Sequence, residues 1–161
     1  MIAMRPATDA DAAAVALIWY QGWRDGHLGH VSEDVVSVRT EASFRSRAVL
    51  RVADTTVAAV DRDIAGFIMV VDDEVEQVYV ARAERGSGLA VALLARAEEM
   101  VAGNGHEYAW LAVVAGNARA RRFYERNGWI DRGPIDYEGA TDGGPAVLIP
   151  ARRYEKRVSV I

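Results

Sequence analysis

Cysteine is absent from the 161 residues of this chain. A protein without thiols forms no disulfide bonds and no thiolate metal sites, and it cannot use a cysteine nucleophile. The three histidines are His27, His30 and His106, and their spacing matches no metal-binding motif. We therefore expect no disulfides and no metal site.

Long apolar runs are missing as well. No apolar segment approaches the ~20 residues that a membrane-spanning helix requires. Near the N-terminus, Asp9 and Asp11 interrupt the segment that would have to be the apolar region of a signal peptide. The expectation is a soluble, cytoplasmic protein that does not bind a membrane.

An excess of positive charge is also lacking. The 23 acidic residues outnumber the 19 lysines and arginines, which leaves a formal net charge of -4. Nucleic-acid-binding domains usually carry a basic face, so nucleic acid is not expected as a partner.

Hydrophobic residues make up 51% of the chain, a composition that supports a sizeable core. We expect a single domain over residues 1–161, because no repeat or linker interrupts it.

Alternating and helical patterns predict one sheet with helices around it. The expected strands are residues 1–5, 55–61, 64–72, 74–80, 108–114, 129–138 and 146–158. The expected helical segments are residues 12–23, 32–38 continuing over 40–49, 88–102 and 117–126. The glycines Gly22, Gly26 and Gly29 are expected to break the next stretch, residues 22–34. This order indicates a mixed α/β or α+β domain.

The strand at residues 74–80 reads EVEQVYV. Successive side chains of a strand point to opposite faces of the sheet. Strict alternation therefore predicts two sets, Val75, Gln77 and Tyr79 on one face and Glu74, Glu76, Val78 and Val80 on the other.

A glycine-rich turn, Arg85-Gly86-Ser87-Gly88-Leu89-Ala90, joins this strand to the helix at 88–102. The first amides of a helix lack intrahelical partners, and the helix dipole adds partial positive charge, so the turn can bind a phosphate. Glycine permits close approach and unusual backbone angles. Ser87 and Arg85 could add side-chain donors. An ordinary strand–helix loop would look similar, since the turn lacks both the Walker ending and the third glycine of a dinucleotide fingerprint.

A second pattern is NARARRFYERNGW, residues 117–129. Asn117 is a good helix N-cap. The apolar face that follows comprises Ala120, Phe123 and Tyr124, and three arginines lie largely opposite, Arg119, Arg122 and Arg126. Taken alone, the pattern predicts an amphipathic surface helix.

Together the two patterns resemble the GNAT superfamily of N-acetyltransferases. The first family motif, Arg/Gln-x-x-Gly-x-Gly/Ala, is matched by Arg85, Gly88 and Ala90. The second, Asn-x-x-Ala-x-x-x-Tyr-x-x-x-Gly-aromatic, is matched by Asn117, Ala120, Tyr124, Gly128 and Trp129. One helix and one strand separate the motifs, as in the family. The resemblance implies a central mixed, mostly antiparallel twisted sheet of about seven strands flanked by about four helices.

The resemblance further implies acetyl-CoA as the acetyl donor. Its pyrophosphate would lie on the turn formed by Arg85, Gly86, Ser87, Gly88, Leu89 and Ala90. Its pantetheine arm would run beside Val78, Tyr79 and Val80, and Asn117 would help to hold it.

In the reaction that the resemblance implies, a primary amine attacks the thioester directly. Tyr124 matches the family tyrosine that donates a proton to the leaving sulfur, and the Val78 N–H is the candidate donor to the carbonyl oxygen. For the general base we favour Glu76 over Glu74. His27 and His30 are further candidates.

We therefore expect an N-acetyltransferase that acts on a primary amine of a small molecule or peptide. The alternatives are a non-catalytic acyl-CoA-binding regulatory module and an enzyme whose acceptor lies on a partner protein. An acceptor pocket could be lined by Trp19, Tyr20, Trp23 and Tyr137. Relatives that acetylate a ribosomal protein often carry Glu where this chain has Ala112, which disfavours that acceptor. By analogy with the family, the last strands could also form a homodimer.

Overall fold

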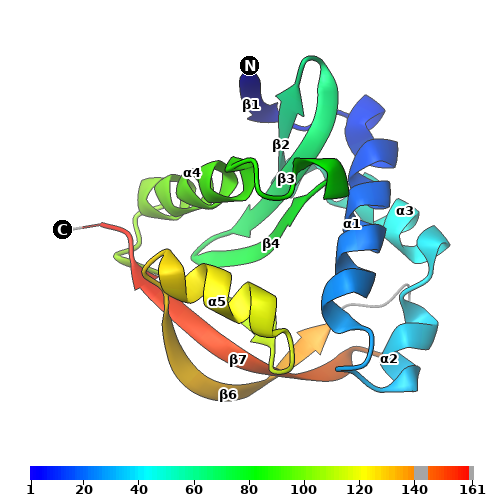
Figure 1. Ribbon diagram of the computed structural model, residues 1–161, viewed down its shortest axis with the longest axis vertical. Helices are drawn as coiled ribbons and strands as arrows, with labels where there is room; N and C mark the ends of the chain where they lie inside the picture. Colours follow the sequence, from blue (N-terminus) through cyan, green and yellow to red (C-terminus); the bar gives the residue numbers. More distant parts are fainter. Residues whose placement is uncertain (140–144, 160–161) are drawn as a thin grey trace.

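The computed structural model describes residues 1–139 and 145–159. This part of the chain forms seven strands and five α-helices (Figure 1). The strands are β1 (Ile2–Pro6), β2 (Thr55–Val60), β3 (Asp63–Val71), β4 (Glu74–Val80), β5 (Tyr108–Val114), β6 (Ile130–Gly139) and β7 (Val147–Arg157). The helices are α1 (Ala12–His27), α2 (Glu33–Val38), α3 (Glu41–Leu50), α4 (Leu89–Gly103) and α5 (Ala118–Arg126).

The seven strands form one sheet in the order β1-β2-β3-β4-β5-β7-β6. All neighbouring pairs are antiparallel except β4 and β5, which are parallel. The expected mixed, mostly antiparallel sheet of seven strands is thus confirmed. The last strand, β7, lies inside the sheet between β5 and β6.

The structure has five α-helices where the resemblance implied about four, because the helical region at 32–49 is divided. Arg39 and Thr40 separate α2 from α3. Thr40 has an extended backbone, and its hydroxyl accepts a hydrogen bond from the Ser43 N–H at 3.1 Å. The bond satisfies one of the first amides of α3, which have no partner within the helix. Thr40 is therefore the start of a new helix and not part of a continuous one.

The break expected at Gly22 and Gly26 is wrong, since α1 continues through both glycines to His27. These glycines serve close packing. A Cβ at Gly22 would lie 2.3 Å from Cδ1 of Tyr79, and one at Gly26 would lie 2.7 Å from Nδ2 of Asn117. The helix therefore gives up intrinsic stability at two positions so that its backbone can approach β4 and the start of α5.

Two apolar clusters lie on opposite faces of the sheet. On one face, α4 buries Leu89, Leu93 and Leu94 against the strands, and α5 packs beside it. On the other face, α1 and α3 meet around Trp19 and Phe44, whose rings are 5.3 Å apart in an edge-to-face contact. Figure 1 shows α4 crossing β2–β4 and α5 lying along β7.

A β-bulge at Glu76 interrupts the alternation of β4. On β3, Met69 lies opposite Gln77 and Val70 lies opposite Val75, so Glu76 has no partner there. Such an extra residue reverses the faces of the residues on one side of it.

The two sets expected from strict alternation are therefore wrong. Val75 packs in the same cluster as Val78 and Val80, instead of sharing the face of Tyr79. Because Glu74 points away from its neighbour Val75, it lies on the face of Tyr79. The bulge thus turns the first carboxylate of β4 towards α1 and α3.

β4 and β5 separate almost as soon as they meet. Both strands are fully described, and their register is limited to Glu74 opposite Trp110. The Trp110 N–H also donates to the Asp73 carbonyl oxygen at 3.1 Å. Beyond this point, the edge of β4 that faces β5 has no strand partner, and a gap opens in the middle of the sheet.

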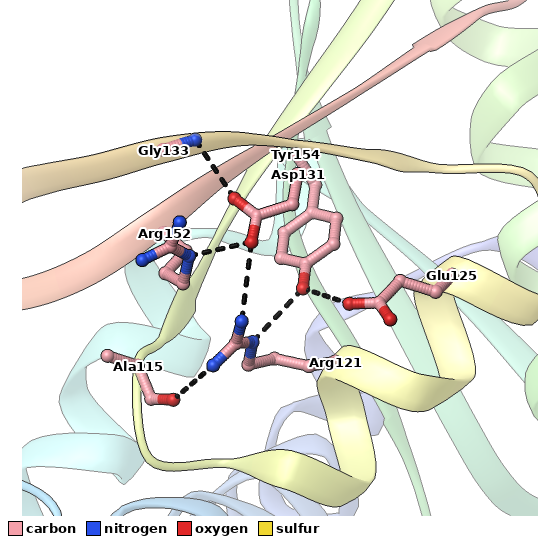
Figure 2. A network of polar contacts seen from close by, with 7 residues as sticks. All are labelled: Ala115, Arg121, Glu125, Asp131, Gly133, Arg152 and Tyr154. Atoms are coloured by element: carbon pink, nitrogen blue, oxygen red, sulfur yellow. Dashed lines mark hydrogen bonds and ion pairs between the residues drawn. The ribbon is translucent and has the colours of Figure 1, made fainter.

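α5 lies beside this gap and is fixed by a polar network (Figure 2). None of its residues is fully buried. Arg121 donates from Nε to the Tyr154 hydroxyl at 3.1 Å and from a terminal nitrogen to Asp131 at 3.3 Å. The hydroxyl of Tyr154, a completely buried residue of β7, donates to Glu125 at 2.5 Å. The network ties α5 to β6 and β7.

Among the described residues, no helix is both long enough and apolar enough to cross a membrane.

The network generates a prediction about stability. Tyr154→Phe should lower the free energy of unfolding by about 1–2 kcal/mol, because it removes two hydrogen bonds at a buried site. The measurement is urea denaturation followed by circular dichroism. Arg96→Gln, which breaks an exposed ion pair with Glu99, is the control and should cost less than about 0.5 kcal/mol. Equal losses in the two variants would contradict the role given to the network.

Candidate active site

Two hollows meet at the gap between β4 and β5. The first, of about 210 Å³, is lined by six charged residues, Arg39, Arg47, Arg51, Glu74, Glu76 and Glu138, and we call it the charged hollow. The second, of about 530 Å³, lies between the glycine-rich turn and α5, and we call it the turn-side groove. Both are lined by Val78, Tyr79, Asn117, Ala120 and Tyr124. The two hollows therefore adjoin at these shared residues, and we call the space that they form together the passage.

The glycine-rich turn forms one wall of the turn-side groove. Gly86 and Gly88 have φ of 80° and 88°, a left-handed conformation that favours glycine. A Cβ at either position would meet nothing within 4 Å, so their surfaces are open. Gly88 is the N-cap of α4, and the amides of Ala90 and Val91 follow in its first turn without intrahelical acceptors. The turn can therefore present backbone donors to an anion.

The side chains of the turn are engaged within the protein. Arg85 donates to Asp25 of α1 at 2.5 Å, and Arg82 donates to the same carboxylate at 2.9 Å. The Ser87 hydroxyl donates to the Glu84 carbonyl at 2.6 Å and accepts from the Leu89 N–H at 3.3 Å. Direct phosphate contacts by Arg85 and Ser87 stay predictions, and they would compete with these bonds.

Asn117 lies where α1, β5 and α5 meet. Its side-chain oxygen accepts from the Ala120 N–H at 3.2 Å, which caps α5 as expected. Its side-chain nitrogen packs against Gly26 of α1. From this position the residue lines both hollows, as a group that holds a ligand in the passage would have to.

Tyr124 lies at the junction of the two hollows. Its ring packs against Phe123, Trp129 and Tyr154, with centroids 5.3, 6.1 and 6.3 Å away. Burial raises the pKa of its phenol well above the usual value near 10. The hydroxyl is therefore protonated at neutral pH and can act as a proton donor in the passage.

Glu74 and Glu76 both line the charged hollow, but their environments differ. The Arg51 guanidinium donates to both oxygens of Glu76, at 3.2 and 2.8 Å. Glu74 accepts a short hydrogen bond from the Tyr137 hydroxyl. Burial raises the pKa of Glu74, although the bond from Tyr137 opposes the shift. Arg51 thus holds Glu76, whereas Glu74 is bonded to a phenol and has a raised pKa.

The histidines differ from each other as well. His27 stacks on Trp23 at 4.5 Å, and its Nδ1 lies 2.8 Å from the Trp23 carbonyl oxygen. Burial lowers the pKa of His27 to about 4, so it is neutral at physiological pH, and it lines the charged hollow. His30 packs on Gly116 and lines neither hollow. Of the two, His27 alone lines one of the two hollows.

Of the four aromatic residues expected around an acceptor, three line the charged hollow, Trp19, Trp23 and Tyr137. Tyr20 does not; it packs on Phe44. The arginines of the charged hollow were missed by sequence reasoning. Arg47 lies in α3, and Arg51 follows directly after its last residue. A spacing of four residues places both on the same side of a helix. Nothing in the sequence indicated that this side faces the gap.

Among the described residues, no group of three or more His, Asp or Glu side chains could hold a metal ion.

Comparison with known proteins agrees with this geometry. The family model described as the acetyltransferase (GNAT) family matches residues 16–129. No curated protein matches the chain.

Solved structures with the same fold include two at 18% identity. One is the PaiA N-acetyltransferase from Thermoplasma acidophilum in complex with coenzyme A, with a TM-score of 0.73 over 98% of this chain and 99% of that one. The other is YncA from Salmonella typhimurium with its cofactor acetyl-CoA, with a TM-score of 0.73 over 100% of this chain and 96% of that one. These likenesses show the fold.

A third structure, of nourseothricin acetyltransferase, is 29% identical over 65% of each chain, with a TM-score of 0.54. The family match covers both sequence motifs and every strand from β2 to β5. The chain is therefore a member of the acetyltransferase (GNAT) family and an acyltransferase.

Proposed function

We propose that the protein transfers the acetyl group of acetyl-CoA to a primary amine of a small molecule or peptide. The observation that carries the proposal is the position of Tyr124, a protonated phenol at the junction of the two hollows. A donor that enters from one side and an acceptor that enters from the other would meet at this hydroxyl.

The residues around the turn-side groove fit acetyl-CoA. The backbone of Gly86 and Gly88 is open to a diphosphate, and the first amides of α4 supply donors. The unpaired edge of β4 offers the backbone groups of Val78 and Val80 to the amide groups of a pantetheine arm. A groove of about 530 Å³ accommodates a ligand segment of this size.

Acetyl-CoA would supply a thioester whose carbonyl carbon is attacked by a neutral amine. The C–N bond forms and the C–S bond breaks. Tyr124 gives its proton to the leaving sulfur, and the Val78 N–H donates to the carbonyl oxygen. The proton that the amine loses goes to Glu74, directly or through water. We assign Glu74 rather than Glu76 as the base, because Arg51 holds both oxygens of Glu76.

The acceptor enters the charged hollow in this proposal. At about 210 Å³ the hollow is smaller than the ~300–1,000 Å³ of pockets for drug-sized ligands. This favours a small amine or a single peptide side chain or terminus, which a partner protein could also present. Binding of acyl-CoA without transfer to any amine would instead support the regulatory module.

We also propose a homodimer as the assembly to test. β6 is an edge strand, and its unpaired backbone groups could join a second copy. Light scattering after size-exclusion chromatography measures the mass directly.

The phosphate cradle is tested by Gly88→Ala. The new methyl group would occupy the open space at the N-terminus of α4, and we expect the rise in Tm with millimolar acetyl-CoA to be lost. Gly105→Ala is the matched control, since Gly105 has φ of 93° and equally open surroundings at the other end of α4. Both variants should lose about 1–2 kcal/mol of stability through backbone strain. An equal rise in Tm with acetyl-CoA for both variants would show that the turn is not part of the binding site.

Tyr124→Phe should lower kcat by about 10²-fold, because general acid catalysis typically contributes at least that much. The Kd for acetyl-CoA, measured by calorimetry, should change by less than about twofold. Turnover is read from released CoA thiol across a panel of primary amines. Tyr108→Phe, on the exposed part of β5, is the control and should behave as the wild type. Unchanged turnover in Tyr124→Phe would refute the role of the phenol.

The pH dependence tests the base. If Glu74 accepts the proton, kcat/KM falls as pH decreases through its raised pKa. Tyr137→Phe removes a hydrogen bond that favours the charged carboxylate, so the pKa of Glu74 rises further and the acidic limb moves to higher pH. Glu74→Gln should remove that limb.

Three other charged groups act on Glu74, namely Glu76, Asp73 and Arg51. Glu76→Gln therefore provides the comparison. Loss of the acidic limb in Glu76→Gln, with the limb kept in Glu74→Gln, would transfer the role of the base to Glu76.

A further inference from the structure

The second wall of the turn-side groove is α5, which presents arginines to it. Arg119 and Arg126 line the groove, whereas Arg122 does not. Residues seven apart in a helix lie on the same side, about 10.5 Å apart along the axis. The two arginines therefore form a short row that faces the groove.

These arginines differ from the others near the groove in how they are used. Within the described residues, the side chains of Arg119, Arg122 and Arg126 are exposed and have no hydrogen bond, ion pair or ring contact. Across the groove, Arg85 is paired with Asp25, and on α5 itself Arg121 is held in the network with Tyr154. The uncommitted positive charge of the groove is thus on α5.

The stability of α5 does not account for this arrangement. Arginines at i and i+3 or i+4 repel each other on a helix surface. Arg119 also lies in the first turn, where the helix dipole disfavours a cation. Glu84 is the one carboxylate among the residues that line the groove, and it lies on the opposite wall. An anionic ligand between the walls would offset both penalties.

We propose that Arg119 and Arg126 bind the 3′-phosphate of coenzyme A, and that the enzyme uses them to distinguish coenzyme A from its 3′-dephospho form. The inference rests on the proposed function for the identity of the ligand. Coenzyme A has two separate anionic groups, the diphosphate and the phosphate on the ribose. The groove has two separate anion-binding walls, the backbone amides of the turn and the guanidinium groups of α5.

The division of labour follows from the chemistry of each wall. Backbone amides at a helix N-terminus suit the diphosphate, which has to approach the chain closely. Long guanidinium side chains reach outwards and bind a terminal phosphate through two parallel N–H donors. Because both arginines are exposed, the binding should weaken as salt concentration rises.

Calorimetric titration with coenzyme A and with 3′-dephospho-coenzyme A tests the proposal without any turnover. We expect the wild type to bind coenzyme A at least about tenfold more tightly, since hydrogen bonds to charged groups each contribute at this level. In the double variant R119Q/R126Q the preference should disappear, because the Kd for coenzyme A rises while that for the dephospho form stays within about twofold. R122Q, with the same charge change on the same helix, should keep the preference.

Three results would overturn the inference. A wild type that binds both ligands equally uses no 3′-phosphate contact. A double variant that loses affinity for both ligands to the same degree has lost a contact with the diphosphate or nonspecific electrostatic attraction. An equal effect of R122Q would show that the preference arises from the net positive charge of α5 and not from contacts by Arg119 and Arg126. A wild type that binds neither ligand would overturn the proposed function as well. In the three results above the wild type still binds coenzyme A, so a failure of this inference alone is distinguishable from a failure of the proposed function.

Discussion

The limited pairing between β4 and β5 is the constraint on which the rest of the site depends. A parallel pair that continued would fill the centre of the sheet with hydrogen bonds. Here the strands meet at Glu74 and Trp110 and then separate, which leaves one edge of β4 unpaired. Unpaired backbone inside a protein has to be satisfied by something else. In the proposed function, the amide groups of the pantetheine arm complete the sheet at this gap, and the two hollows are its two openings.

What keeps the gap open lies on its two sides. On the β4 side of the gap, α4 is held by Leu93 and Leu94, which are buried against β3 and β4. α5 fastens the other side by polar bonds from Arg121 and Glu125 to the neighbouring strands. The first wall is held by apolar burial and the second by directed hydrogen bonds. Because hydrogen bonds depend on both distance and angle, those of Arg121 and Glu125 fix the orientation of α5, and with it the position of Tyr124.

The individual strands, the glycine-rich turn and the α5 pattern could be predicted from the sequence, because each depends on residues close together in the chain. The pairing of the strands into one mixed, mostly antiparallel sheet was predicted only from the resemblance to the family. The sequence could not predict the bulge at Glu76, which arises from how β4 pairs with β3. Nor could it predict the Arg51–Glu76 bond, which joins residues 25 apart. In the proposed mechanism, these long-range contacts decide which carboxylate is available as a base. The helical glycines of α1 were misread for the same reason, since their partners, Tyr79 and Asn117, lie far along the chain.

The place of β7 between β5 and β6 has a consequence for biosynthesis. β1 to β4, with α1 to α4, form contacts among residues made early, so they can assemble while the ribosome is still adding residues. β5 acquires its full partner only when β7 has emerged, because the register of β5 extends along β7 from Tyr108 to Val114. Until then α5 lacks Tyr154 as its anchor. In the order of synthesis, the α4 side of the gap can therefore form before the α5 side, which depends on β7.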